Sequence, residues 1–167
     1  MNKILLIITG SIAASKCKEI ITLLSINEVK ISCILTKEAK KYAKISDIKK
    51  LLKNRIFTDE DEKKNKMLHI NLSRDNDIIV MCPATANSIA KFANGYGDNL
   101  ASNTLLASNK KILFVPAMNS FMWHNKINQK NVRLLKDSGH EFIGPKVGNL
   151  KCGEFGLGRI DNSKNIV

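Results

Sequence analysis

The chain has 167 residues and carries 27 Lys and Arg against 15 Asp and Glu, a formal net charge of +12. With 44% hydrophobic and 25% charged residues it has the composition of one globular domain with a sizeable core, and no apolar run is long enough to cross a membrane. We therefore expect a single domain over residues 1–167 and no membrane partner. We also expect a cytoplasmic location, because the first apolar run is too short for a signal peptide.

The positive charge does not by itself indicate a nucleic-acid partner. The lysines are spread over residues 37–66 and beyond, without the interleaved aromatic side chains that stack on bases. We expect a solvated lysine surface and no nucleic acid, although a basic rim would still attract a phosphorylated small molecule.

The four cysteines, Cys17, Cys33, Cys82 and Cys152, are widely spaced and contain no C-x-x-C pair. This spacing predicts neither a metal site nor a disulfide framework. The first three lie in apolar patterns and are expected to be ordinary buried thiols.

The first predicted element is a buried strand from Lys3 to Thr9, nearly free of polar residues, as in a parallel sheet covered on both faces. Gly10-Ser11 then forms a turn, and Ile12 to Leu24 has helical periodicity. Such a strand, turn and helix place free backbone N–H groups at one point, which suits a phosphate. Because the full G-x-G-x-x-G spacing is missing, a mononucleotide is favoured over a dinucleotide.

The second strand is predicted from Val29 to Leu35, with helices following at 38–42 and 45–52. Between them stand Thr36 and Lys37. These residues either contact a cofactor or serve as a helix cap and a surface lysine.

The next stretch gives weaker signals. Residues 57–66 are acidic and then basic, and are predicted to form an exposed loop. Met67 to Leu72 is half apolar and contains His69. A lone histidine of this kind is more often a hydrogen-bonded structural residue than a catalyst, and the stretch alone leaves both interpretations open.

A third strand is predicted from Asp77 to Met81, broken by Pro83, after which a helix begins. Thr85 is placed to cap that helix, with Asn87 and Ser88 in its first turn. This would be a second helix N-terminus at the same edge of the sheet, again suited to a ligand.

A helix at 99–107 leads into a strand from Lys111 to Val115, and Pro116 ends that strand at the start of PAMNSFMW. Open α/β sheets build their sites beyond the carboxyl ends of such strands. The amide of Asn119 can both donate and accept hydrogen bonds, and its Met and Trp neighbours offer an apolar wall. The competing interpretation is a loop whose Met and Trp only fill the core.

The chain ends with a predicted helix at 127–137, a strand at 140–143 and the segment 144–159, which holds five glycines around Cys152. We call residues 144–159 the flap. It is too glycine-rich for a regular element, and we expect it to be mobile; the alternative is a frayed terminal loop. A lone cysteine in such a segment is better explained by reactivity than by packing. The alternation of strands and helices predicts an α/β three-layer fold with a parallel sheet.

Five stretches in this order resemble the flavin-dependent cysteine decarboxylase family over nearly the whole chain. They are GSIAASK at Gly10, HINL at His69, PATANSIAK at Pro83, PAMNSFMW at Pro116 and KCGEFGLGR at Lys151. The resemblance implies a flavodoxin-like (Rossmann-like) fold and a flavin mononucleotide (FMN) cofactor. It further implies a lyase that decarboxylates 4′-phosphopantothenoylcysteine to 4′-phosphopantetheine in coenzyme A biosynthesis.

The resemblance also assigns roles to residues. It places the substrate carboxylate at Asn119, the active-site base at His69 and the proton donor at Cys152. It implies FMN contacts from Gly10, Ser11, Thr36, Thr85, Ala86, Asn87, Ser88 and Ala117. It implies a homo-oligomer, a trimer or a multiple of trimers, with the flavin near a subunit interface. Asn99 and Lys151 depart from the family pattern, and we expect no fused synthetase domain.

Three other functions share features with this chain. Peptidyl-cysteine decarboxylases act on a peptide C-terminus and lack the flap cysteine, and PAMNSFMW argues against a flavin prenyltransferase. Non-enzymatic regulatory subunits of the superfamily lose the catalytic set or divide it between chains. Because His69, Asn119 and Cys152 are all present in this one chain, an enzyme is favoured.

Overall fold

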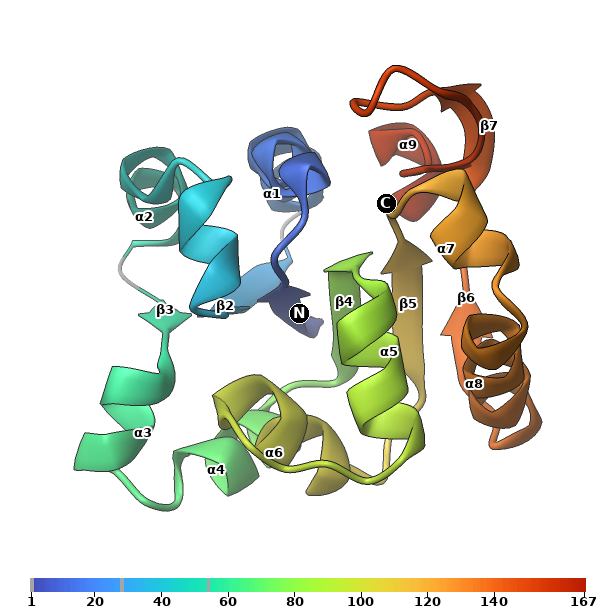
Figure 1. Cartoon of the computed structure of the whole chain (residues 1–167). Helices are drawn as coiled ribbons and strands as arrows, with labels where there is room; N and C mark the ends of the chain where they lie inside the picture. Colours follow the sequence, from blue (N-terminus) through green and yellow to red (C-terminus); the bar gives the residue numbers. More distant parts are fainter. Residues whose placement is uncertain (1, 28, 54) are drawn as a thin grey trace.

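The computed structural model describes residues 2–27, 29–53 and 55–167. Six strands form one parallel sheet in the order β3-β2-β1-β4-β5-β6, with helices on both of its faces (Figure 1). The strands are β1 (Lys3–Ile8), β2 (Lys30–Leu35), β3 (Ile56–Phe57), β4 (Ile78–Ala84), β5 (Ile112–Pro116) and β6 (Glu141–Phe142). The predicted α/β fold with a parallel sheet is confirmed.

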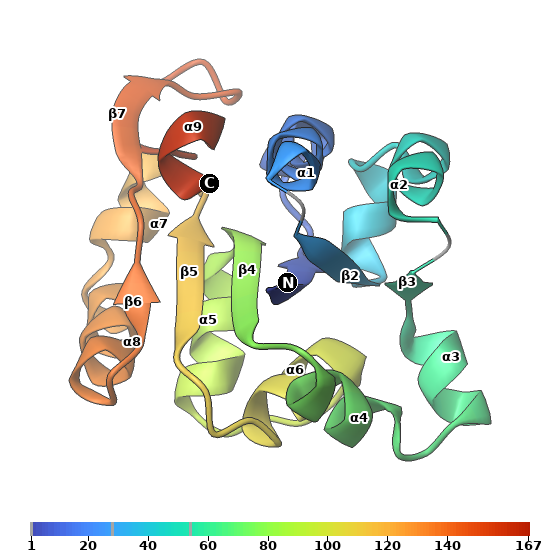
Figure 2. The same ribbon diagram turned by 180° about the vertical axis from the view of Figure 1, so that it is seen from behind.

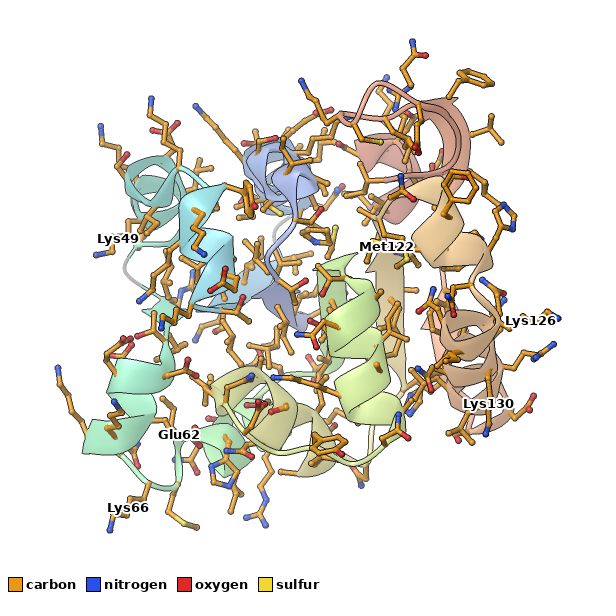
Figure 3. The ribbon with its side chains drawn as sticks, in the orientation of Figure 1. Lys49, Glu62, Lys66, Met122, Lys126 and Lys130 are labelled. Atoms are coloured by element: carbon orange, nitrogen blue, oxygen red, sulfur yellow. The ribbon has the colours of Figure 1, made fainter. Side chains whose placement is uncertain are left out.

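The helices follow the strands along the chain. They are η1 (Ile12–Lys16), α1 (Cys17–Ile26), η2 (Glu38–Lys41), α2 (Ile45–Leu52), α3 (Asp59–Lys64), α4 (Leu68–Asp75), α5 (Ala86–Ala93), α6 (Leu100–Leu106), α7 (Ser120–His124), α8 (Lys126–Asp137) and α9 (Ser163–Ile166). No helix in the described ranges is long and apolar enough to span a membrane. Figure 3 labels lysines on α2, beyond α3 and on α8, so the positive charge is spread over separate elements.

The central strand β1 divides the core into two layers. Ile4, Leu6 and Ile8 pack with the residues of α1 and α2 on one face. Leu5 and Ile7 point to the other face and pack with α4, α5, α6 and α8, and Figure 2 shows the layers from behind. Because both faces are covered, β1 is apolar at nearly every position, which is why the sequence identifies it so clearly.

The predicted exposed loop at 57–66 is wrong, because this stretch forms the end of β3 and helix α3. Its DEDEKK sequence has no apolar face, so helical periodicity could not reveal it. Local hydrogen bonds define the helix instead: Thr58 and Asp61 form a capping box. The side chain of Asp59 also accepts a hydrogen bond from the Leu100 amide, which ties α3 to the start of α6.

The predicted break at Pro83 is also wrong, since β4 continues through this proline to Ala84. The pairing with β5 shifts register between Met81 and Ala84, and a proline without an N–H group is tolerated at such an irregularity. The Thr9 hydroxyl stabilises the bend by donating to the Pro83 carbonyl at 2.6 Å and accepting from the Thr85 amide at 3.3 Å.

The flap contains a regular element after all. Its strands β7 (Lys146–Asn149) and β8 (Phe155–Arg159) form an antiparallel hairpin. Glycine serves close packing here: a Cβ at Gly158 would lie 2.2 Å from the Met118 carbonyl oxygen. The Met118 amide donates to the Gly158 carbonyl at 3.0 Å, so the root of the hairpin packs directly on the segment before α7.

Smaller differences concern helix ends and short helices. The predicted helix at 12–24 divides into η1 and α1, and the HINL stretch lies inside α4. The sequence patterns did not indicate α7 or α9, which span five and four residues. Asn99 caps α6 through a hydrogen bond to the Ser102 amide, so this departure from the family pattern has a structural role.

Asp161 anchors the base of the flap. Its side chain is buried and accepts bonds from Lys146 Nζ at 2.9 Å and from Asn165 Nδ2 at 2.8 Å. Burial acts to raise the pKa of Asp161, but the bonds from Lys146, Asn165 and the Asn162 amide outweigh it and lower that pKa. The ionised carboxylate therefore holds β7 against the C-terminal segment.

We expect Asp161→Asn to lower the free energy of unfolding at neutral pH by about 1–3 kcal/mol, because it removes a hydrogen-bonded buried charge. The lowered pKa of Asp161 means that its stabilisation is complete above the unfolded-state value of about 3.9 and is lost as pH falls through the folded-state pKa. The difference between wild type and variant should therefore shrink in strong acid. Urea unfolding followed by circular dichroism would measure it, and a difference independent of pH would contradict this account.

Candidate active site

The loops predicted to hold a cofactor meet at one edge of the sheet. The loop after β2 carries Thr36, the loop after β1 carries Gly10 and Ser11, and the loop after β4 begins at Thr85. Ala117 follows β5. Because these four strands are parallel neighbours, their carboxyl ends lie side by side, at the upper ends of β4 and β5 in Figure 1. The roles of these residues toward a cofactor stay predictions.

The turn at Gly10 is closely packed against the next loop. A Cβ at Gly10 would lie 2.4 Å from Glu38 Cβ, so only glycine fits beside η2. Ser11 caps η1 by accepting from the Ala13 amide at 3.2 Å. The close packing brings the loops after β1 and β2 together.

Thr36 has a clear local role. Its amide and hydroxyl both lie within hydrogen-bond distance of the Ile8 carbonyl, at 3.1 and 3.2 Å, and its hydroxyl accepts weakly from the Ala39 amide at 3.4 Å. Thr36 thus joins β2 to the end of β1 and contacts the first turn of η2, whose N-cap residue is Lys37. Lys37 has an exposed side chain.

Helix α5 presents its N-terminus to the same edge. Thr85 caps it by accepting from the Ser88 amide at 3.2 Å, and the two hydroxyls lie 2.9 Å apart. The amides of Ala86 and Asn87 are in the first turn, where the helix itself provides no acceptor. Asn87 is exposed, and the helix dipole adds positive potential at this point. The arrangement suits an anionic group such as a phosphate.

Ala117 lies at the floor of this edge. It is 5% exposed, and its amide donates to the Ala84 carbonyl at 3.2 Å. It can shape a ligand site by its small size and its backbone, since its side chain belongs to the apolar core.

Asn119 is held in one orientation by helix α7. As the N-cap, its Oδ1 accepts from the Phe121 amide at 2.8 Å and from the Met122 amide at 3.4 Å. The Nδ2 group is therefore directed away from α7, where it donates to Glu154 and lies 3.5 Å from Cys152 Sγ. The helix cap therefore leaves the Nδ2 donor of Asn119 to groups outside α7, here Glu154 on the flap.

Cys152 and Glu154 bring the flap to Asn119. Cys152 is exposed, and its Sγ lies 3.5 Å from Glu154 Oε2, the oxygen that also accepts from Asn119. The sequence analysis assigned no role to Glu154. The available signal was an acid two residues after the cysteine in KCGEFGLGR, on the same turn of the flap.

The other three thiols lie in the core, as predicted. Contact with Cys82 and burial raise the pKa of Cys17, and burial raises the pKa of Cys33. Such thiols are poor proton donors and nucleophiles at neutral pH. Cys152 is the cysteine with access to a ligand.

His69 lies apart from Asn119 within one chain. It sits on α4, which packs on α3 and α6, whereas α7 packs on α8 and β8. In Figures 1 and 2, α7 lies near the upper ends of β4 and β5, whereas α4 lies below the lower ends of these strands. The structure thus brings Asn119 and Cys152 together but leaves His69 elsewhere.

His69 has a carboxylate neighbour that the sequence analysis missed. Its Nδ1 lies 2.6 Å from Glu62 Oε1, although the contact lacks the alignment of a hydrogen bond. Figure 3 labels Glu62 at the lower left, on α3, and Met122 well to its upper right, on α7. Glu62 belongs to the DEDE run that was predicted to be a loop.

Known proteins are similar to this chain over its whole length. A family model described as "Flavoprotein" matches residues 1–167. A probable phosphopantothenoylcysteine decarboxylase from Streptococcus mutans is 32% identical, with 99% of this chain and 95% of that protein covered. The coenzyme A biosynthesis bifunctional protein CoaBC of Bacillus subtilis is also 32% identical, but the chain spans only 41% of it.

Solved structures agree with the fold. A cysteine-to-serine mutant of PPC decarboxylase, complexed with pantothenoylaminoethenethiol, superposes with a TM-score of 0.90 at 29% identity, covering 99% of this chain and 93% of that one. The FMN binding protein AtHal3 gives 0.89 at 29% identity, covering 99% and 92%. The peptidyl-cysteine decarboxylase EpiD gives 0.83 at 29% identity, covering 99% and 96%.

Proposed function

Since the chain belongs to the flavoprotein family, we propose that it is a carbon–carbon lyase that uses FMN to decarboxylate 4′-phosphopantothenoylcysteine to 4′-phosphopantetheine in coenzyme A biosynthesis. The match to a phosphopantothenoylcysteine decarboxylase along nearly the full length of both chains supports this substrate. The observation that carries the proposal is the contact of the Asn119 amide with the flap that bears Cys152.

The residues at the sheet edge fit a flavin mononucleotide. The first-turn amides of α5, at Ala86 and Asn87, suit its phosphate, and the close packing of Gly10 on Glu38 holds the neighbouring loops after β1 and β2 together at the same edge. Thr36, Thr85, Ser88 and Ala117 complete the contacts that we propose. Flavin supplies the two-electron oxidation that turns the substrate's thiol carbon into an electron sink beside its carboxylate.

The protein's own groups then have separate tasks. Asn119, fixed by its cap, holds the substrate carboxylate through Nδ2. His69 serves as the base that takes a proton from the substrate. The ene-thiol left after loss of CO2 is two electrons short of phosphopantetheine; these return as hydride from the reduced flavin, and Cys152 supplies the accompanying proton. The similar PPC decarboxylase structure supports the last role, since there a cysteine-to-serine mutant is complexed with an ene-thiol, pantothenoylaminoethenethiol.

We propose that a second copy of the chain supplies His69, in a trimer or a multiple of trimers. A single chain keeps His69 away from Asn119, so the catalytic set is incomplete without a partner. Exposed apolar side chains beside Asn119 support such an interface: Phe121 is 78% exposed, Phe155 73% and Met122 49%.

Other functions fit the site less well. A peptidyl-cysteine decarboxylase would have no use for Cys152, which here contacts Asn119. A regulatory subunit would not need the set of His69, Asn119 and Cys152. We place the reaction in the cytoplasm, because buried free thiols such as Cys17, Cys33 and Cys82 suit a reducing compartment.

Gly10→Ala is expected to weaken flavin binding roughly tenfold or more, about 1.4 kcal/mol, because the added Cβ collides with Glu38 and moves the neighbouring loop. Flavin absorbance per chain and titration of the stripped protein with FMN would measure this. Lys111→Ala is the control, since this exposed side chain lies just before β5, at the opposite edge of the sheet. Equal flavin affinity of Gly10→Ala and wild type would contradict the proposed site.

Cys152→Ser tests the proposed reaction, because a hydroxyl is a much weaker acid than a thiol. The variant should still release CO2 from 4′-phosphopantothenoylcysteine but accumulate the ene-thiol, which is lighter than phosphopantetheine by one molecule of H2. Mass spectrometry of the products would show the difference. Lys151→Ala, in the adjacent flap position, should make phosphopantetheine normally; if Cys152→Ser does so at the wild-type rate, Cys152 is not the donor.

A further inference from the structure

Three functional groups meet at the tip of the flap, and one of them, Glu154, has no role in the proposed reaction. The carboxylate of Glu154 accepts from the Asn119 amide through Oε2, and the same oxygen lies 3.5 Å from Cys152 Sγ. Glu154 is half-buried, whereas Cys152 is exposed. A single carboxylate oxygen thus links the proposed substrate holder to the proposed proton donor.

The chemistry of the contact indicates what Glu154 replaces. The cap on α7 uses Asn119 Oδ1, so Nδ2 is the part of the amide left for a ligand. The group now bound to Nδ2 is a carboxylate. In the proposed reaction the substrate presents a carboxylate to the same Nδ2.

We propose that Glu154 occupies the place of the substrate carboxylate when the flap is closed, and that the two carboxylates take turns at Asn119. The inference rests on the proposed function. Substrate binding displaces Glu154 and moves the flap tip outward, because two like charges at one amide repel. When CO2 leaves, the place becomes free, Glu154 returns, and Cys152 arrives with it.

The shape of the flap suits this exchange. Its root is fixed, since Gly158 pairs with Met118 and a Cβ at Gly156 would lie 2.7 Å from Ser120 Oγ. Its tip is a tight turn in which the Leu150 amide donates to the Glu154 carbonyl at 2.7 Å. Glu154 and Cys152 share this turn, so they move together while the root stays in place.

The exchange gives the reaction an order. Cys152 approaches the substrate only after the carboxylate has gone, so the proton donor is absent during oxidation and decarboxylation and present for the final protonation. Glu154 is a positioning residue in this scheme, because it acts through Asn119 and Cys152.

Glu154→Gln removes the charge but keeps the shape, and two ligands distinguish its effects in the flavin-loaded protein. One is 4′-phosphopantothenoylserine, which has the carboxylate but no thiol; the other is 4′-phosphopantetheine, which lacks the carboxylate. Calorimetry should show the variant binding the serine analogue about 2–10-fold more tightly than wild type, because a competing hydrogen-bonded carboxylate is gone. Phosphopantetheine should bind no more tightly. Glu141→Gln, on the exposed start of β6, is the control and should change neither affinity.

Equal shifts for both ligands, or none for the serine analogue, would overturn the proposal. A measurement without ligand tests the role of Glu154 independently of the assigned substrate. Hydrogen exchange at the Leu150 and Gly153 amides should be faster in Glu154→Gln than in wild type, because the closed tip loses its contact with Asn119. If wild type binds neither ligand, the substrate assignment is wrong. The exchange rates then decide whether Glu154 holds the flap tip on Asn119. Faster exchange in Glu154→Gln supports this role, and unchanged exchange overturns it.

Discussion

The direction of the strands is the constraint on which the site depends. Because all six strands of the main sheet are parallel, each loop after a strand leaves from the same edge. Gly10, Thr36, Thr85 and Ala117 are far apart in sequence, yet the pairing of β2, β1, β4 and β5 makes them neighbours. The same direction puts α4, which precedes β4, at the opposite edge, and this is why His69 cannot join Asn119 within one chain.

Much of the fold could be predicted from the sequence, because buried parallel strands such as β1 are continuous apolar runs. The features that were missed depend on specific contacts. Helix α3 is defined by the capping box of Thr58 and Asp61, and the passage of β4 through Pro83 depends on the distant Thr9 hydroxyl. The flap hairpin depends on Gly158 packing against the chain before α7. None of these contacts leaves a periodic pattern.

Some residues of the candidate site could be identified from the sequence, and others only from the structure. The resemblance to a family marked Asn119 and Cys152, and the structure places them together. It could not reveal Glu154 or Glu62, because their importance lies in which side chain each one meets. Charged residues in a polar stretch look like a solvated surface until the fold supplies partners, as it does for Glu62 with His69 and for Glu154 with Asn119.

We propose that one copy of the chain supplies Asn119 and Cys152 and that another supplies His69. Mixing His69→Asn with Asn119→Asp, each inactive alone, tests it most directly. After co-expression, a site that pairs the intact Asn119 of one copy with the intact His69 of its neighbour should form at about a quarter of positions in randomly mixed oligomers, so about a quarter of wild-type CO2 release should return. Mixed oligomers that stay as inactive as the separate variants would contradict the account.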